Sequence, residues 1–123
     1  MSTKCFILIV DKNYSSSLIM SKRLASMGYT SETVNSTERA IEYIQSTSTI
    51  PDLILVHFNE MEDSLADLPR RIQESTAWKS MIPVAALSTV SDKAFTLKLF
   101  HSGYSDFMIR PIEHEVFKDH IEK

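Results

Sequence analysis

Short apolar runs alternate with amphipathic stretches along the whole chain of 123 residues. The apolar runs have the length of strands, whereas the amphipathic stretches carry apolar residues on one helical face, as in Ala40, Ile41 and Ile44. The pattern predicts five strands and five helices in strict alternation. The strands cover about residues 5–10, 29–34, 53–57, 84–88 and 105–109, and the helices cover about 14–27, 35–46, a segment ending near 75, 92–102, and a last one from Glu113.

Capping residues mark several of the predicted helix ends. Asn13 is placed to cap the first helix, and Gly28 is placed to end it in the left-handed conformation. Asn35 and Glu38 form a capping-box pattern at the start of the second helix. These signals set the boundaries of the first two helices.

Boundaries in the second half of the chain are set by proline, glycine and polar residues. Pro69 lies inside the third helical pattern, which predicts either a late start near Leu68 or a kink. Ser91 or Asp92 caps the fourth helix, and Gly103 stops it.

The alternation of strands and helices predicts parallel strands joined by right-handed crossovers. The first, third and fourth strands are almost wholly apolar, as expected when both faces of a sheet are covered. The predicted fold class is therefore α/β, a doubly wound sheet of five βα units. Ligands of such sheets bind at the carboxyl ends of the strands.

Composition narrows the class of protein. The chain is 43% hydrophobic and 24% charged, which is typical of one folded domain over residues 1–123. Its net charge of −3 and the lack of a basic block argue against nucleic-acid binding. No apolar run is long enough for a signal peptide or a membrane span, so we expect a cytoplasmic protein. No cofactor is expected.

Polar residues follow four of the predicted strands at their carboxyl ends. Asp11 and Lys12 follow the first strand, His57 ends the third, Ser88 ends the fourth, and Arg110 follows the fifth. Because parallel strands end at one edge of the sheet, these side chains are expected to gather there.

Four fragments in series, ILIVD, PDLILV, IPVAALS and GYSDFMIRPI, resemble the receiver (response-regulator) domain of two-component signalling over essentially the whole chain. The resemblance implies a flavodoxin-like sheet of strand order 2-1-3-4-5, with two helices on one face and three on the other. It also implies a site with two adjacent acids that help to hold Mg²⁺, an aspartate that is phosphorylated, a hydroxyl, a lysine and a switch aromatic.

Three of these positions are altered here. Asp11 matches the first acid, but Lys12 replaces the second, and His57 stands where the family has its phosphoacceptor aspartate. Ser88 matches the hydroxyl position, and Arg110 replaces the lysine. The resemblance thus implies a degenerate phosphorylation site.

Two further positions match the family pattern. Phe107 stands at the switch aromatic, although a residue of this kind is more often part of the core. Pro111 matches the family proline, so we expect a cis bond between Arg110 and Pro111.

The altered residues predict that the Mg²⁺ site is lost. Mg²⁺ prefers hard oxygen ligands, usually carboxylates. Only Asp11 remains of three acids, and the ammonium of Lys12 would repel the ion.

His57 has three interpretations. It could hydrogen-bond to Asp11 or to a loop backbone group and fill the vacated site, or it could accept a phosphoryl group itself. A transition-metal site with Asp11 and Glu60 or Glu62 is too sparse in ligands to favour. We expect the first interpretation to hold.

The remaining site residues keep two interpretations each. Lys12 is either a solvated loop residue or a cation near Asp11, and Arg110 is either a forked donor or exposed. Ser88 is either a strand-end cap or a phosphate ligand.

The helix of about 92–102 has more apolar residues than one buried stripe needs, so one or two should be partly exposed. In the family, the face formed by this helix, the fifth strand and the last helix binds partners. The candidate interaction face comprises Phe95, Phe100, His101, Tyr104 and Phe107.

Two functions follow. The first is a phosphorylation-independent receiver domain that acts as a protein-protein interaction module and binds a signalling protein through this face. The alternative is an active response regulator, phosphorylated by unusual chemistry at His57. An unrelated enzyme is not expected, because the chain shows no nucleophile–base pair and no glycine-rich phosphate loop. The chain is either a small protein or a piece of a hybrid kinase or larger regulator.

Overall fold

The structure is a computed structural model, and it describes residues 6–46, 50–58, 68–75, 82–88 and 93–109. Within these residues it contains five strands, β1 (Phe6–Val10), β2 (Thr30–Val34), β3 (Leu53–Phe58), β4 (Val84–Ser88) and β5 (Asp106–Ile109). All neighbouring strands are parallel, and their order is β2-β1-β3-β4-β5. The predicted fold class and strand order are therefore confirmed.

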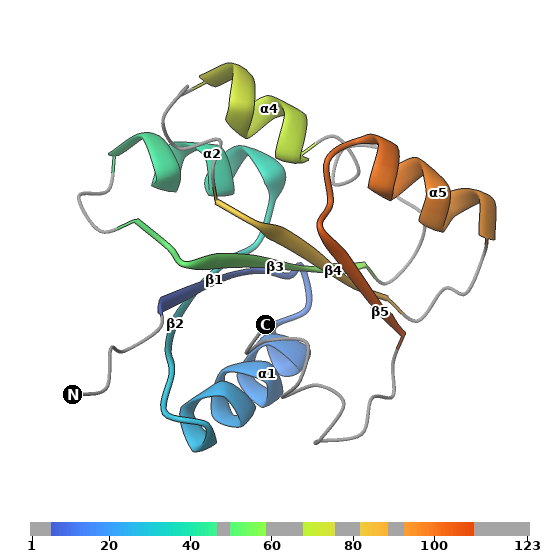
Figure 1. The fold of residues 1–123 in the computed structure, drawn as a ribbon. Coiled ribbons are helices and arrows are strands. Elements are labelled where there is room, and N and C mark those ends of the chain that lie inside the picture. The colour runs from blue at the N-terminus through green and yellow to red at the C-terminus, as the bar shows by residue number, and fades with distance from the viewer. Residues whose placement is uncertain (1–5, 47–49, 59–67, 76–81, 89–92, 110–123) are drawn as a thin grey trace.

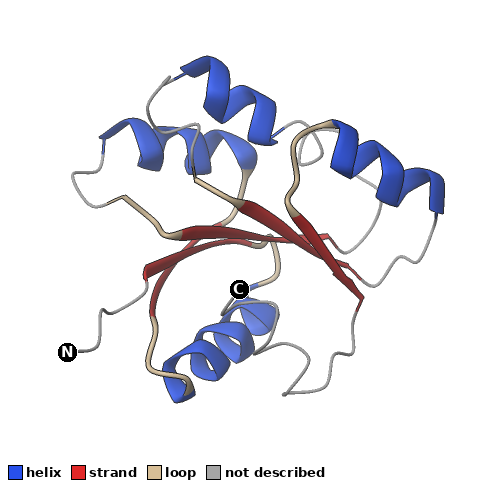
Figure 2. Ribbon diagram, viewed as in Figure 1, coloured by secondary structure: helices blue, strands red, loops and turns tan. Residues whose placement is uncertain are grey.

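The described helices lie in two layers around the sheet (Figure 1). Helix α1 (Tyr14–Ser26) covers one face, whereas α2 (Thr37–Ser46), α4 (Leu68–Ser75) and α5 (Lys93–His101) cover the other (Figure 2). The last predicted helix, from Glu113, falls outside the described residues. None of the described helices is long and apolar enough to cross a membrane.

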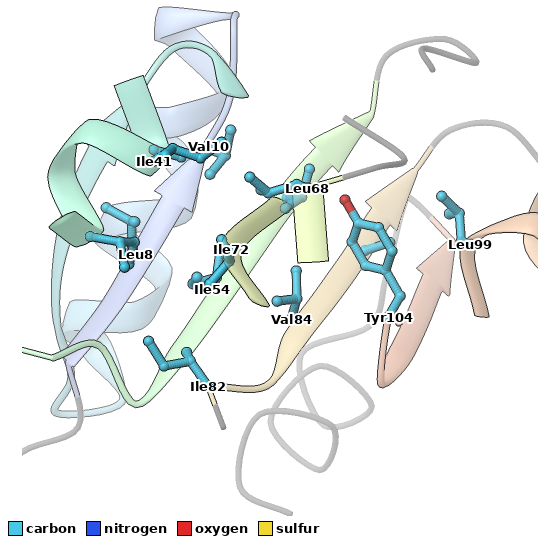
Figure 3. Packing of buried hydrophobic residues seen from close by; sticks show 14 of the residues in the cluster. Leu8, Val10, Ile41, Ile54, Leu68, Ile72, Ile82, Val84, Leu99 and Tyr104 are labelled. Carbon is cyan, nitrogen blue, oxygen red and sulfur yellow. The ribbon is translucent and has the colours of Figure 1, made fainter. Parts of the chain in front are cut away.

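Side chains of each strand alternate between the two faces and so build two separate cores. In β1, Ile7 and Ile9 pack with Leu24 of α1, whereas Leu8 packs with the cluster under the other helices. The larger cluster joins β1, β3 and β4 to all three helices of its face (Figure 3). Its members include Leu8, Val10, Ile41, Ile54, Leu68, Ile72, Ile82, Val84, Leu99 and Tyr104.

Two predicted helix ends are confirmed, and one capping prediction is wrong. Asn13 caps α1, since its side-chain oxygen accepts a hydrogen bond of 3.0 Å from the backbone N–H of Ser16. Gly28 follows α1 with φ of +88°, the left-handed conformation that glycine tolerates best. At α2, however, Ser36 accepts the bond from Arg39 N–H at 3.1 Å, so the cap lies one residue after the predicted Asn35.

The described boundaries of the later helices follow the sequence signals, whereas the predicted caps Ser91 and Asp92 lie outside the described residues. Helix α4 begins at Leu68, which confirms the late start, and Pro69 lies in its first turn, where no backbone donor is needed. Helix α5 ends at His101, and Gly103 follows with φ of +107°.

Helix α1 does not bury all of its apolar side chains. Ser17, Met20 and Leu24 are buried against the sheet. Leu18 and Ile19 are 41% and 62% exposed, although their spacing would fit an apolar face as well. The face of α1 that meets the sheet is therefore the one that carries Ser17, Met20 and Leu24, and Leu18 and Ile19 lie outside it.

Candidate functional site at the carboxyl edge of the sheet

Parallel pairing brings Asp11 and His57 together. Strands β1 and β3 are neighbours, and Val10 lies opposite Val56, so the next residue of each strand reaches the same level of the sheet edge. Asp11 continues the alternation of Ile7 and Ile9, and its backbone N–H still donates to Val34 of β2 at 3.0 Å. Both side chains therefore lie on the α1 side.

The carboxylate of Asp11 accepts three hydrogen bonds. Its Oδ2 lies 3.0 Å from Nδ1 of His57 and accepts a bond of 2.8 Å from the hydroxyl of Ser16. Its Oδ1 accepts a bond of 2.9 Å from the backbone N–H of Asn13. The hydrogen bond expected between His57 and Asp11 is therefore present.

Ser16 is the one member of this cluster that sequence reasoning missed. Its hydroxyl also lies 3.4 Å from Nδ1 of His57, so it contacts both partners of the pair. A signal was available, because a residue three positions after the helix cap Asn13 lies in the first turn of α1, above the end of β1. The three residues Asp11, Ser16 and His57 are called the polar cluster below.

Charge on the cluster can be assigned from these contacts. Burial alone would raise the pKa of Asp11, but hydrogen bonds from His57, the Asn13 backbone and Ser16 outweigh burial and lower it. The carboxylate is therefore ionised near neutral pH and can only accept. Nδ1 of His57 must then carry the proton of their shared bond, an assignment made from the hydrogen-bond network.

Both members of the pair are buried. Asp11 is 3% exposed and His57 is 4% exposed. The cavity beside them measures about 40 Å³ and is lined in part by Ile19, Met20 and Arg23 of α1. A space of that size holds a water molecule or two.

Of the other predicted site residues, the structure describes Lys12 and Ser88. Lys12 is exposed. Its charge helps to lower the pKa of Glu38, after the larger effects of the Glu38 backbone N–H and the Arg71 guanidinium. Ser88 is fully buried at the end of β4, opposite Phe58 and one position past His57. Arg110 and Pro111, and with them the expected cis bond, lie outside the described residues, as do Glu60 and Glu62.

The described residues of this edge do not match a Mg²⁺ site. Mg²⁺ takes oxygen ligands in a near-octahedral shell, usually with one or two carboxylates. Asp11 supplies one carboxylate, and both of its oxygens already accept hydrogen bonds. Across the described ranges, no three His, Cys, Asp or Glu side chains gather in a way that would hold a metal ion.

The candidate interaction face is partly present on α5. Phe100 is 45% exposed, His101 is exposed and Leu97 is 51% exposed, which confirms that one or two apolar residues of this helix reach the surface. Phe107 is half-buried, and it packs against the core of its face. The side chain of Phe95 lies outside the described part of the chain.

Tyr104 does not belong to this surface, and its assignment to the interaction face was wrong. It is only 3% exposed. Its ring packs edge to face on Phe58, with centroids 5.8 Å apart, and it joins the larger core cluster (Figure 3). From the sequence, an aromatic residue directly after Gly103 is compatible with either the surface or the core. The structure places Tyr104 in the core.

Comparisons with known proteins find similar sequences among two-component signalling proteins. No family model matches the chain. It is 30% identical over 120 residues to hybrid signal transduction histidine kinase L of Dictyostelium discoideum, covering 95% of this chain but 7% of the kinase. It is 28% identical over 106 residues to a two-component response regulator of Oryza sativa subsp. indica, covering 86% of this chain and 79% of the regulator.

Among solved structures, the chain is similar to the signal receiver domain of a signal transduction histidine kinase from Syntrophus aciditrophicus. The TM-score is 0.81 and the identity 25%, and the match covers 96% of this chain and 87% of that one. Fold, motif order and sequence similarity together therefore support a receiver (response-regulator) domain of two-component systems.

Proposed function

We propose that this chain is a receiver domain that works without phosphorylation, as a protein-interaction module in signal transduction. The observation that carries the proposal is the buried contact between His57 and Asp11, at the position where the family resemblance expects a phosphoacceptor aspartate. The contact occupies both groups on which phosphoryl transfer would depend.

Phosphorylation of His57 would have to overcome three obstacles. Nδ1 carries the proton of the bond to Asp11, so attack would be limited to Nε2 of a neutral imidazole. The side chain is 4% exposed, and the neighbouring cavity of about 40 Å³ is too small for a phosphodonor. Finally, phosphoryl transfer relies on cations that neutralise developing charge, and the described residues offer no Mg²⁺ site.

The polar cluster also does not work as a hydrolytic triad. In such a triad the histidine accepts the serine proton. Here the hydroxyl of Ser16 donates to Asp11, and Nδ1 of His57 already bears a proton. We therefore assign the cluster a structural role and propose that the domain is not an enzyme.

Without a phosphoryl input, the domain would act through the surface of α5. Leu97 and Phe100 are one turn apart and both about half exposed. The helix segment 93–101 carries basic residues, Lys93 and Lys98, and no acid. This surface suits a signalling protein in the cytoplasm that presents an apolar patch with an acidic rim.

A capture experiment with matched variants tests the proposal. Immobilised wild-type chain, Phe100→Asp and Ile19→Asp are compared on an extract of the source cells, with and without a small acyl phosphate and Mg²⁺. Ile19 is the control because it is exposed and apolar and belongs to α1, the helix on the opposite face of the sheet (Figure 1). We expect one partner to bind the wild type and Ile19→Asp under both conditions, and to be lost with Phe100→Asp.

Two results would overturn the proposal. Retention of the partner by Phe100→Asp would remove α5 as the docking surface. Capture only after treatment with the phosphodonor would show that the domain depends on phosphorylation.

A further inference from the structure

A larger pocket lies on the side of β1 that faces β2. It measures about 460 Å³ and lies between the first turns of α1 and the loop from β2 to α2. Its lining includes Tyr14 and Leu18 of α1, Thr33 at the end of β2, and Arg39 of α2. The volume is in the range of small-molecule sites, about 300–1,000 Å³. The polar cluster explains neither its size nor its exposed side chains.

The charge around this pocket is positive. Lys12 and Arg39 both line it, and both are exposed. Asp11 is the one acid in the lining, so the two cations outnumber it, and its oxygens are already engaged by Asn13, Ser16 and His57. The pocket therefore favours an anion although the whole chain carries a net charge of −3.

Arg39 is well suited to hold such an anion. Within the described part of the chain its guanidinium makes no hydrogen bond or ion pair, and its backbone N–H donates to the hydroxyl of Ser36. The nearby acid Glu38 is instead bonded to Arg71, at 3.2 Å. A planar guanidinium binds phosphate or carboxylate through two parallel hydrogen bonds.

The opposite wall of the pocket is apolar and aromatic. Tyr14 is 75% exposed and Leu18 is 41% exposed. They lie four residues apart on α1 and so share one side of the helix. Neither is needed by the α1 core, which uses Met20 and Leu24. A flat ring would cover the apolar surface that these two side chains leave open to water.

We propose that this pocket binds a small anion that carries a flat ring, of the nucleoside monophosphate class. The phosphate lies between Lys12 and Arg39, and the ring lies over Tyr14 and Leu18. Thr33 and Asn35 supply hydrogen-bonding groups between the two ends. The site is separate from the α5 surface, so this proposal can be tested independently of the proposed function.

Titration with adenosine 5′-monophosphate, followed by amide chemical shifts, tests the proposal. We expect saturable binding with Kd below about 1 mM, with shifts confined to residues 12–21 and 33–39. Adenosine and inorganic phosphate, titrated separately, should each bind at least about tenfold more weakly, since each satisfies one wall only.

Charge variants sharpen the test. Arg39→Gln should weaken binding of the monophosphate about 2- to 5-fold, as expected for the loss of one exposed ion pair. Lys22→Gln is the matched control, because Lys22 is an exposed cation on α1 outside the pocket lining. It should leave Kd unchanged. Thermal melts of both variants verify that they are folded.

Several outcomes would overturn the proposal. These are a Kd above about 1 mM, shifts that map to another surface, and equal affinity for inorganic phosphate alone. An unchanged Kd in Arg39→Gln, or an equal loss in Lys22→Gln, would also contradict it, because the anion would then not lie beside Arg39.

Discussion

Under α2, α4 and α5 the sheet is packed with buried aliphatic and aromatic side chains, whereas on the α1 side the core ends in the polar cluster. The same strands build both faces, since successive residues point to opposite sides. The first face couples three helices to the sheet and is expected to carry most of the stability. The α1 face has the smaller cluster of buried apolar residues, and its outer end holds the polar cluster.

The largest loss of stability should come from a substitution in the face covered by α2, α4 and α5. Ile54 is fully buried in the central strand β3, so Ile54→Ala should lower the free energy of unfolding by about 2–5 kcal/mol. Urea unfolding measures the change. The control is Ile19→Ala, which removes the same atoms from a side chain that is 62% exposed and should cost within about 0.5 kcal/mol. Similar losses in both variants would contradict the packing described here.

A smaller loss of stability is expected from a substitution in the polar cluster. His57→Ala removes one donor from a buried carboxylate and should cost about 1–3 kcal/mol. The same unfolding measurement detects it. A more stable variant would show that the imidazole is a strained remnant and not a structural partner of Asp11.

Loss of the helix cap Asn13, next to the polar cluster, should lower stability by a smaller amount. Asn13→Ala leaves the Ser16 N–H without its acceptor and should cost about 1 kcal/mol. Asn35→Ala is the matched control, because Ser36 and not Asn35 caps α2. If Asn35→Ala costs as much as Asn13→Ala in thermal melts, the assignment of the second cap is wrong.

The smallest effect is confined to acidic pH. The folded-state pKa of Asp11 is lowered, so its ionised form stabilises the fold above the pKa of the unfolded chain, and this contribution is lost as pH falls through the folded pKa. Stability of the wild type should therefore decline in acid more steeply than that of Asp11→Asn. Parallel declines in unfolding free energy with pH would show that Asp11 does not contribute.

Sequence pattern was sufficient for the fold because each strand and helix carries its own local signal. The apolar runs, Asn13, Gly28 and Pro69 predicted the elements, and the family motifs supplied the strand order. They also predicted the contact between Asp11 and His57, since parallel neighbours must end at one edge.

What sequence could not supply depends on how side chains share space. Ser16 is one serine among several in its helix, and only the helix position above β1 brings it to Asp11. Tyr104 and Leu18 are both apolar, yet packing buries one and exposes the other. The pocket beside α1 likewise combines residues from α1, β2 and α2 whose spacing carries no motif.

The central proposal is that the site at His57 receives no phosphoryl group. Intact mass of the wild-type chain, after incubation with a small acyl phosphate and Mg²⁺, tests it most directly. The buried contact between His57 and Asp11 predicts an unchanged mass. A gain of one phosphoryl group in the wild type that disappears in His57→Ala would contradict the claim.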